Sequence, residues 1–210
     1  MSAAATVLRL GDAGGAVVLL ETSRALPLVS ISIGLKTGAL LDPPGKEGTT
    51  RLLSRLMRRT GGGLEASVID TRIDSLGGSL GADVAHSTLA FQATVISRSL
   101  DAFVDLLVDV LARPGLAADE LTRLQRETLA ELTDSLDDDR GLARRFFRRR
   151  FFGAHPYGRS VSGTAKTVPE ITSADVAGVF RRGFVRENLV FAFSGDLDAC
   201  LLYTSPSPRD

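Results

Sequence analysis

The clearest group of residues that could do chemistry is the segment Arg51-Leu52-Leu53-Ser54-Arg55. In a helix, positions i and i+4 project from one face, so Arg51 and Arg55 would stand side by side with Ser54 next to them. Guanidinium groups stay cationic and offer no free lone pair, so they repel a metal ion and cannot ligate it. Ser54 cannot act as a general base at neutral pH without a partner. The segment therefore predicts a cationic helix face and no metal site.

Other residues that could carry chemistry are few. His86 falls between two predicted strands and His155 precedes Pro156, and we interpret both histidines as structural or exposed, with no metal-binding role. The serines show no nucleophile elbow. The glycines Gly61–Gly63 follow a predicted helix, whereas a phosphate-binding loop follows a strand. The sequence outside the arginine segment therefore predicts no catalytic centre.

The composition limits the class of protein. The chain has 210 residues, of which 44% are hydrophobic and 24% charged, and this is enough for one domain with a sizeable core. Its net charge is zero, which argues against a protein built around nucleic acid or an anionic membrane. No stretch has the apolar length of a membrane span. Met1–Thr22 has no basic n-region, so we predict no secretion signal and leave the compartment as cytoplasmic or periplasmic in a bacterium.

The last eleven residues, Cys200–Asp210, fit nothing before them. Their back-translation resembles one reading frame of a transposase adapter used to prepare sequencing libraries. We interpret them as read-through, with residues 1–199 as a truncated N-terminal domain of a protein that continues. The alternative is a natural Ser/Pro tail. Without Cys200 the chain has no cysteine, and so no disulfide or thiolate chemistry.

Hydrophobic periodicity predicts a mixture of strands and helices. The predicted strands are Val17–Glu21, Leu28–Leu35, Ser79–Ala85, Thr88–Val95 and Leu189–Phe193. The predicted helices are residues 50–59, Leu64–Leu76, Leu100–Leu111, Ala118–Leu136, Leu142–Phe152 and Ser173–Phe180. Thr49 or Thr50 is the expected cap of the first helix. The order lacks a regular βαβ alternation, so the fold class is α+β.

One predicted helix is rich in both arginine and phenylalanine. Its arginines are Arg144, Arg145, Arg148, Arg149 and Arg150, and its phenylalanines are Phe146, Phe147, Phe151 and Phe152. Such a helix could bind RNA or a membrane surface. Alternatively, the phenylalanines enter the core while the arginines are solvated or meet Asp137–Asp139. The zero net charge favours the second interpretation.

Several short motifs in a fixed order carry a family resemblance. They are Pro27–Val29, Gly38–Gly48, Leu76–Gly78, Phe152–Gly158, Gly163–Thr164 and Asn188–Asp196. Over residues 5 to 198 the chain resembles the inverted zinc peptidases, namely pitrilysin, insulin-degrading enzyme and the mitochondrial processing peptidase. The resemblance implies an antiparallel or mixed sheet flanked by helices, forming one lobe of a two-lobed clamp.

The sequence departs from this family where the family binds its metal. The enzymes carry H-x-x-E-H on the helix after the Gly48 loop, with two histidines that bind Zn²⁺ and a glutamate that activates water. Here Arg51 and Arg55 occupy the histidine places and Ser54 the glutamate place. Glu131 falls where the family's distal glutamate ligand would be. We interpret Glu131 either as an exposed helix residue or as the ion-pair partner of Arg51 or Arg55.

The resemblance also implies a peptide-binding strand. In the family, the strand after the Gly-Gly turn takes the substrate peptide by β-addition. The matching residues here are Gly81, Ala82, Asp83 and Val84. The alternative is an ordinary strand with a glycine bulge.

Together these features predict a non-catalytic half of a heterodimeric zinc peptidase. The zinc would lie on a catalytically active homologue of the same family, and this chain would need no cofactor of its own. The expected ligand is a peptide or an unfolded protein. One alternative is a structural core subunit of a larger complex, as in the respiratory cytochrome complex. The other is a zinc peptidase with an unrecognised ligand set.

Overall fold

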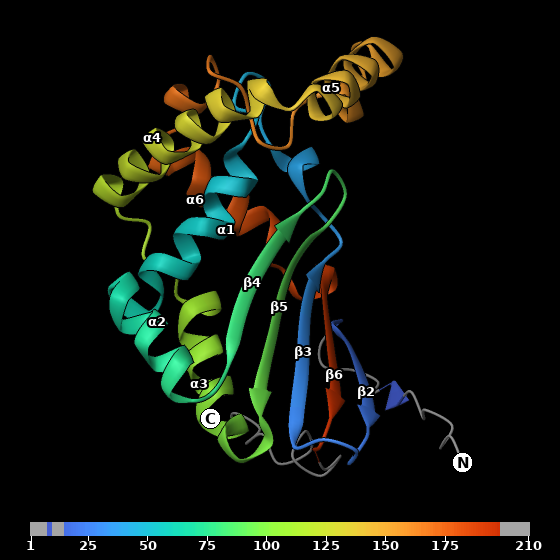
Figure 1. The fold of residues 1–210 in the computed structure, drawn as a ribbon, viewed down its shortest axis with the longest axis vertical. Helices are drawn as coiled ribbons and strands as arrows, with labels where there is room; N and C mark the ends of the chain where they lie inside the picture. The colour runs from blue at the N-terminus through green and yellow to red at the C-terminus, as the bar shows by residue number, and fades with distance from the viewer. Residues whose placement is uncertain (1–7, 10–14, 198–210) are drawn as a thin grey trace.

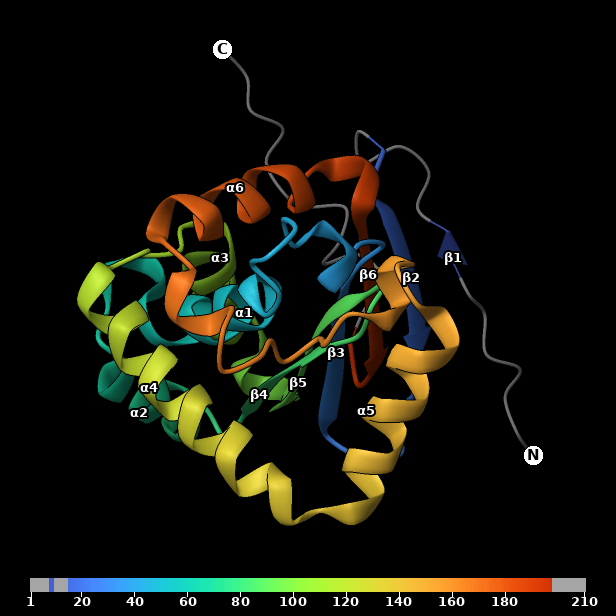
Figure 2. The same ribbon diagram turned by 90° about the horizontal axis from the view of Figure 1, so that it is seen from above.

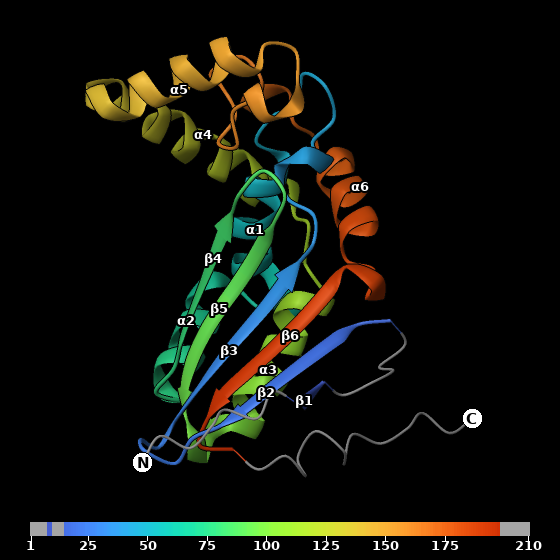
Figure 3. The same cartoon turned by 90° about the vertical axis from the view of Figure 1, so that its right-hand side faces the viewer.

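The computed structural model describes residues 8–9 and 15–197 (Figure 1). The segment Cys200–Asp210, predicted to be adapter read-through, lies outside the described residues. The described part is a twisted sheet with helices gathered on one face and at one end (Figures 1 and 3).

The sheet has six strands in the order β1-β2-β6-β3-β5-β4. The strands are β1 (Leu8–Arg9), β2 (Val17–Thr22), β3 (Leu28–Leu35), β4 (Ser79–Val84), β5 (Leu89–Ile96) and β6 (Leu189–Gly195). Strands β2 and β6 run parallel, and every other pair is antiparallel. The sheet is therefore mixed and the fold is α+β, as predicted. The two-residue β1 was not predicted, because so short a segment carries no alternation.

Six α-helices accompany the sheet in the described part of the chain. They are α1 (Thr49–Thr60), α2 (Ala66–Ser75), α3 (Leu100–Ala112), α4 (Ala118–Asp134), α5 (Asp139–Phe152) and α6 (Ser173–Gly183). Helices α1, α2 and α3 pack against the sheet, whereas α4 and α5 lie at one end of the molecule, beyond the tips of β4 and β5 (Figures 1, 2 and 3). Within the described residues, no helix is both long enough and apolar enough to cross a membrane.

The core lies between the sheet and α1. Alternate residues of β3 and β5 face it and are buried, and Ile33 stands opposite Phe91 in the antiparallel register. The buried stripe of α1 that meets them consists of Leu52, Leu53, Leu56 and Met57. Burying each of these side chains stabilises the fold by roughly 1.5–3 kcal/mol before entropy is counted. Because this face of α1 is buried against the sheet, Arg51 and Arg55 lie on a different face of the helix.

The N-terminus of α1 differs from the prediction, because neither Thr49 nor Thr50 caps it. The N-cap residue is Gly48, whose φ of 101° is left-handed. The cap comes instead from Asp42, which is 3% exposed. Its carboxylate accepts hydrogen bonds from the Gly48 N–H and the Thr50 N–H, both at 2.8 Å, and from the Thr50 hydroxyl at 2.6 Å. Burial raises the pKa of Asp42, while these hydrogen bonds act in the opposite direction.

Helix α5 also differs from the prediction. Phe146 and Phe147 are each 68% exposed, Phe151 is 69% exposed, and none of the fourteen residues of α5, all described, is buried. Adjacent helical residues point about 100° apart, so paired phenylalanines spread around the helix and form no single apolar stripe. Among the described residues, no ion pair joins the α5 arginines to Asp137–Asp139. The prediction that the phenylalanines enter the core was wrong.

Candidate functional site

The arginine segment and Glu131 meet between α1 and α4. Arg51 Nη2 lies 3.1 Å from Glu131 Oε2, and Arg55 Nη1 lies 2.8 Å from Glu131 Oε1. One carboxylate therefore bridges two guanidinium groups that stand one helical turn apart on α1. Both interpretations of Glu131 hold, because it is an exposed residue of helix α4 and is also the ion-pair partner of both arginines.

The ion pairs continue along the same two helices as a ladder. Arg55 Nη2 lies 3.1 Å from Glu127 Oε2, and Arg59 Nη2 lies 2.9 Å from the same oxygen. Arg59 Nη1 then reaches Glu120 Oε1 at 2.8 Å. The guanidinium of Arg59 is the main cause that holds the pKa of Glu127 below its usual range. Along the ladder, the residue numbers of the arginines rise from 51 to 59 while those of their glutamate partners fall from 131 to 120. Helices α1 and α4 therefore run antiparallel.

Ser54 lies apart from the ladder. Its side chain is buried, with 2% of the residue exposed, and its hydroxyl donates to the Arg51 carbonyl oxygen at 2.9 Å. Such a bond to a carbonyl in the preceding turn is a common local arrangement for serine in a helix. Ser54 therefore has its hydroxyl proton engaged by the backbone and takes no part in the ion pairs.

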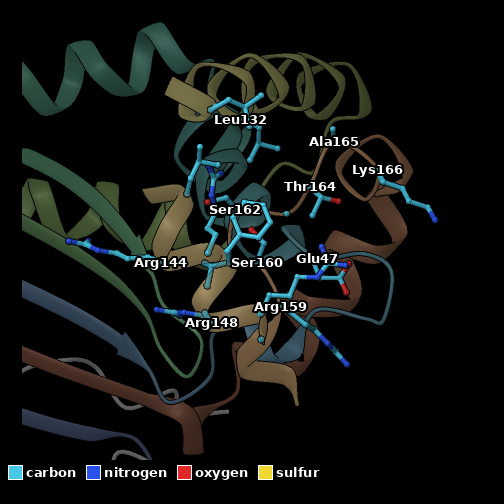
Figure 4. A pocket seen from close by; sticks show the side chains of 18 of the residues that line it. Glu47, Leu132, Arg144, Arg148, Arg159, Ser160, Ser162, Thr164, Ala165 and Lys166 are labelled. Atoms are coloured by element: carbon cyan, nitrogen blue, oxygen red, sulfur yellow. The ribbon is translucent and has the colours of Figure 1, made fainter. Parts of the chain in front are cut away.

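A hollow of about 880 Å³ opens beside this ladder. Side chains of α4 and α5 line one side, and the segment 158–166 lines the other (Figure 4). The two sites are joined, because Arg51 Nη1 donates to the Ser162 hydroxyl at 2.9 Å. The sequence does not predict this hollow, because segment 158–166 has no periodicity. The arginine-rich helix is the one feature of the sequence that points to it.

His86 fixes one wall of the hollow. It is 8% exposed and lies in the turn between β4 and β5. Arg148 Nη1 lies 2.9 Å from its Nδ1, and its Nε2 lies 3.1 Å from the Arg159 carbonyl oxygen. A ring protonated on Nε2 satisfies both contacts. His155 instead accepts from the Tyr157 N–H through Nδ1 and stacks on the Tyr157 ring. Both histidines have structural contacts, as predicted.

Residues 17–165 match the family model described as Insulinase (Peptidase family M16). The chain belongs to this family. An uncharacterized zinc protease of Mycobacterium tuberculosis is 28% identical over 185 residues, which is 88% of this chain and 42% of the relative. The chain thus spans less than half the length of this relative.

Solved M16 structures share the fold. The inactive domain of an M16 peptidase from Pseudomonas fluorescens superposes with a TM-score of 0.88 at 24% identity, over 94% of this chain and 48% of that one. A putative M16-like peptidase from Alicyclobacillus acidocaldarius gives a TM-score of 0.86 at 16% identity, over 100% of this chain and 52% of that one. At these identities the likeness concerns the fold.

The residues between α1 and α4 do not fit the zinc ion that the M16 resemblance implies. A zinc site needs lone pairs from imidazole, thiolate or carboxylate groups, commonly three from the protein. Both carboxylate oxygens of Glu131 already face guanidinium groups. Within the described residues, no three His, Cys, Asp or Glu side chains gather where they could hold a metal ion.

Strand β4, the predicted peptide-binding strand, is the last strand of the sheet on its side. Gly81, Ala82 and Asp83 are exposed and Val84 is half-buried. The register with β5 is continuous from Ser79 opposite Thr94 to Val84 opposite Leu89. A bulge would place two residues opposite one, so the alternative of a glycine bulge was wrong.

Proposed function

We propose that this chain is the non-catalytic half of an M16 zinc peptidase that acts together with a catalytically active homologue. The observation that carries the proposal is the pairing of Arg51 and Arg55 with Glu131. Guanidinium groups fill the place where the family's histidine ligands stand, and a cation pair cannot hold Zn²⁺. The zinc and the general base would therefore come from the partner.

The ion-pair ladder has a physical role in such a subunit. A bound metal ion holds together the helices that supply its ligands. The ion-pair ladder holds α1 and α4 together in the same way without a metal ion. Each of its pairs is partly exposed, so each adds at most about 1 kcal/mol to stability. Their geometry matters more, because they fix the relative position of α1 and α4. The subunit can then keep the M16 fold and its surfaces after losing the metal.

Peptide binding at β4 completes the proposed role. The outer edge of a terminal strand offers backbone N–H and C=O groups to an added strand. Gly81, Ala82, Asp83 and Val84 would pair in this way with an extended peptide. The Pseudomonas fluorescens domain, described as inactive, supports the idea that M16 folds persist without catalysis. The mycobacterial relative is named a zinc protease. We do not extend zinc binding to this chain, because Arg51 and Arg55 cannot ligate a metal ion.

The test is co-expression of the full-length protein with an M16 homologue that carries H-x-x-E-H, followed by separate expression of each. We expect the two proteins to elute as one complex on size-exclusion chromatography. Peptide cleavage per bound zinc should be several-fold faster in the complex than in the homologue alone. Equal cleavage with no complex would favour a structural core subunit. One tightly held zinc on this chain alone would contradict the proposal directly.

A further inference from the structure

The hollow between α4, α5 and segment 158–166 is strongly cationic. Its lining includes six basic side chains, Arg144, Arg145, Arg148, Arg149, Arg159 and Lys166, and one acidic side chain, Glu47. Figure 4 shows Arg144, Arg148, Arg159 and Lys166 around it, on α5 and on the facing segment. In a chain whose net charge is zero, such a local excess creates a positive potential at one place on the surface.

These cations differ from the arginines of α1 in their partners. Arg51, Arg55 and Arg59 each meet a glutamate. By contrast, no basic side chain of the hollow forms an ion pair with a carboxylate among the described residues. The ladder is thus internally neutralised, and the hollow keeps its charge for a ligand.

The hydrogen bonds of the hollow's cations go to neutral groups only. Arg148 contacts the His86 ring, Arg145 donates to the Ser135 carbonyl oxygen at 2.9 Å, and Arg159 donates to a backbone carbonyl. The side chains of Arg144, Arg149 and Lys166 form no hydrogen bond with any described residue. An anionic ligand would therefore meet guanidinium and ammonium donors that no protein carboxylate has satisfied.

The same hollow carries apolar surface. Phe146 is 68% exposed and Leu136 is 58% exposed, and both belong to its lining together with Leu132 and Leu142. Exposed apolar side chains next to unneutralised cations suit a ligand that combines negative charge with bulky apolar groups. A small inorganic anion would contact the cations and leave these apolar side chains unused.

The edge strand β4 leads to the hollow. His86, which lines it, follows β4 by two residues in the turn to β5. Strand β4 ends on the side of the molecule where α5 lies (Figure 1), so a peptide added to its outer edge would reach the hollow that His86 lines. Asp83 is an exposed carboxylate on this edge and would repel acidic side chains of the peptide. The acidic residues would therefore lie past the end of β4, next to the arginines of the hollow.

We infer that this hollow binds the acidic, aromatic-containing part of an extended peptide whose neighbouring residues pair with β4. The inference rests on the proposed function and names the class of peptide that this half selects. Charge sets the selectivity: the guanidinium groups attract glutamate and aspartate side chains, while Phe146 and the leucines contact aromatic side chains of the same peptide.

The test uses the full-length protein and two fluorescein-labelled peptides. One peptide is rich in glutamate and phenylalanine, and the other has every glutamate replaced by lysine. Fluorescence anisotropy should give an affinity at least about tenfold higher for the acidic peptide, and this difference should fall as salt is raised. Arg149→Glu and Arg144→Glu should each weaken acidic-peptide binding by about tenfold.

Arg150→Glu is the matched control. Arg150 lies on the same helix and is exposed, but it does not line the hollow, so the variant makes the same charge change elsewhere. Its binding should change less than about twofold. Equal losses for Arg149→Glu and Arg150→Glu, or equal binding of the lysine peptide, would overturn the inference. So would tighter binding to phosphatidylglycerol vesicles than to the acidic peptide.

The binding assay needs no partner subunit, so its outcome is separate from the co-expression test. A complex that forms normally with an H-x-x-E-H homologue but shows no preference for acidic peptide would remove only this inference. Acidic-peptide binding without any complex would remove only the proposed function.

Discussion

The guanidinium of Arg55 lies 2.8 Å from a carboxylate oxygen of Glu131, across the contact between α1 and α4. The other oxygen of the same carboxylate faces Arg51. Two cations therefore share one anion, and Glu127 supplies the second negative charge to Arg55 at 3.1 Å. Glu131 is therefore within reach of side chains at positions 51 and 55. Substituting these two positions tests whether they can bind a metal ion together with Glu131.

Restoring the family motif should restore zinc binding. In the full-length protein, Arg51→His, Ser54→Glu and Arg55→His would place two imidazoles next to the Glu131 carboxylate. We expect stoichiometric zinc in the purified triple variant and none in the wild type, measured by elemental analysis after dialysis. Peptide cleavage need not return, because groups that orient the ligands are part of a working site.

The matched control for the zinc experiment is the same triple variant with Glu131→Gln. Removing this carboxylate takes away a zinc ligand, so zinc affinity should fall by at least about tenfold, which is the loss caused by removing even a group that only supports a ligand. A folded triple variant that binds no zinc would show that Glu131 does not reach the two histidines.

The stabilising effect of Glu127 should depend on pH. Its pKa lies below the ordinary 4.5, chiefly because Arg59 donates a hydrogen bond to it. A lowered folded-state pKa means that the stabilisation is complete above the unfolded value and is lost as pH falls below it. Glu127→Gln should therefore lower the free energy of unfolding by about 0.5–1 kcal/mol at pH near 7, and by less at pH near 3.

Urea denaturation at the two pH values measures this difference. Glu65→Gln makes the same chemical change at an exposed position on the N-terminal side of α2, where no ion pair is formed with a described residue. It should change the unfolding free energy by less than about 0.5 kcal/mol at either pH. A Glu127→Gln effect that grows as pH falls would contradict the sign of the pKa shift.

Periodicity was enough to place most of the fold. Strand β3 was predicted with its observed bounds, because Val29, Ile31 and Ile33 alternate with polar or small residues and enter the core. Helix α5 was predicted as Leu142–Phe152, with the observed C-terminal end but a start three residues later than the observed Asp139, and its environment was predicted wrongly. Nothing local distinguishes a phenylalanine that enters a core from one at the end of the molecule, since this depends on what tertiary packing puts beneath the helix.

In the candidate site, too, local sequence patterns predict the helices, whereas the contacts between them depend on tertiary packing. The meeting of Arg51 with Glu131 is a contact over 80 positions in the chain, and it was expected only through the family resemblance. The cap of α1 by Asp42 could not be predicted, because a turn brings the carboxylate back to the helix start from six residues away. The cationic hollow needs segment 158–166 to lie opposite α5, which no local pattern encodes.

Removing the Asp42 carboxylate should destabilise the protein strongly. Asp42→Ala leaves the Gly48 and Thr50 N–H groups at the buried start of α1 without their acceptor. Loss of a cap combined with buried unpaired donors costs about 2 kcal/mol or more. Urea denaturation should show this loss. Asp139→Ala, in the exposed first turn of α5, should cost less than about 0.5 kcal/mol, and equal effects of the two variants would refute the capping role.

The attachment of α5 should depend on His86. The helix has no buried residue of its own, so few contacts hold it: Arg148 reaches the His86 ring, Arg145 reaches Ser135, and Phe152 packs against Tyr157. His86→Ala removes the first of these contacts. Local opening of α5 should then become easier, because regions with few buried apolar contacts open at small free-energy cost.

Hydrogen–deuterium exchange measures this opening residue by residue. In His86→Ala, the amides of α5 should exchange at least about threefold faster, while those of α1, whose apolar stripe is fully buried, should keep their rates. Arg148→Ala should reproduce the effect, because it removes the other side of the same contact. Arg150→Ala should leave the rates unchanged, since the Arg150 side chain forms no hydrogen bond with a described residue. If α5 exchanges equally fast in the wild type and in His86→Ala, the Arg148 contact does not hold the helix and the wall of the hollow is fixed by other contacts.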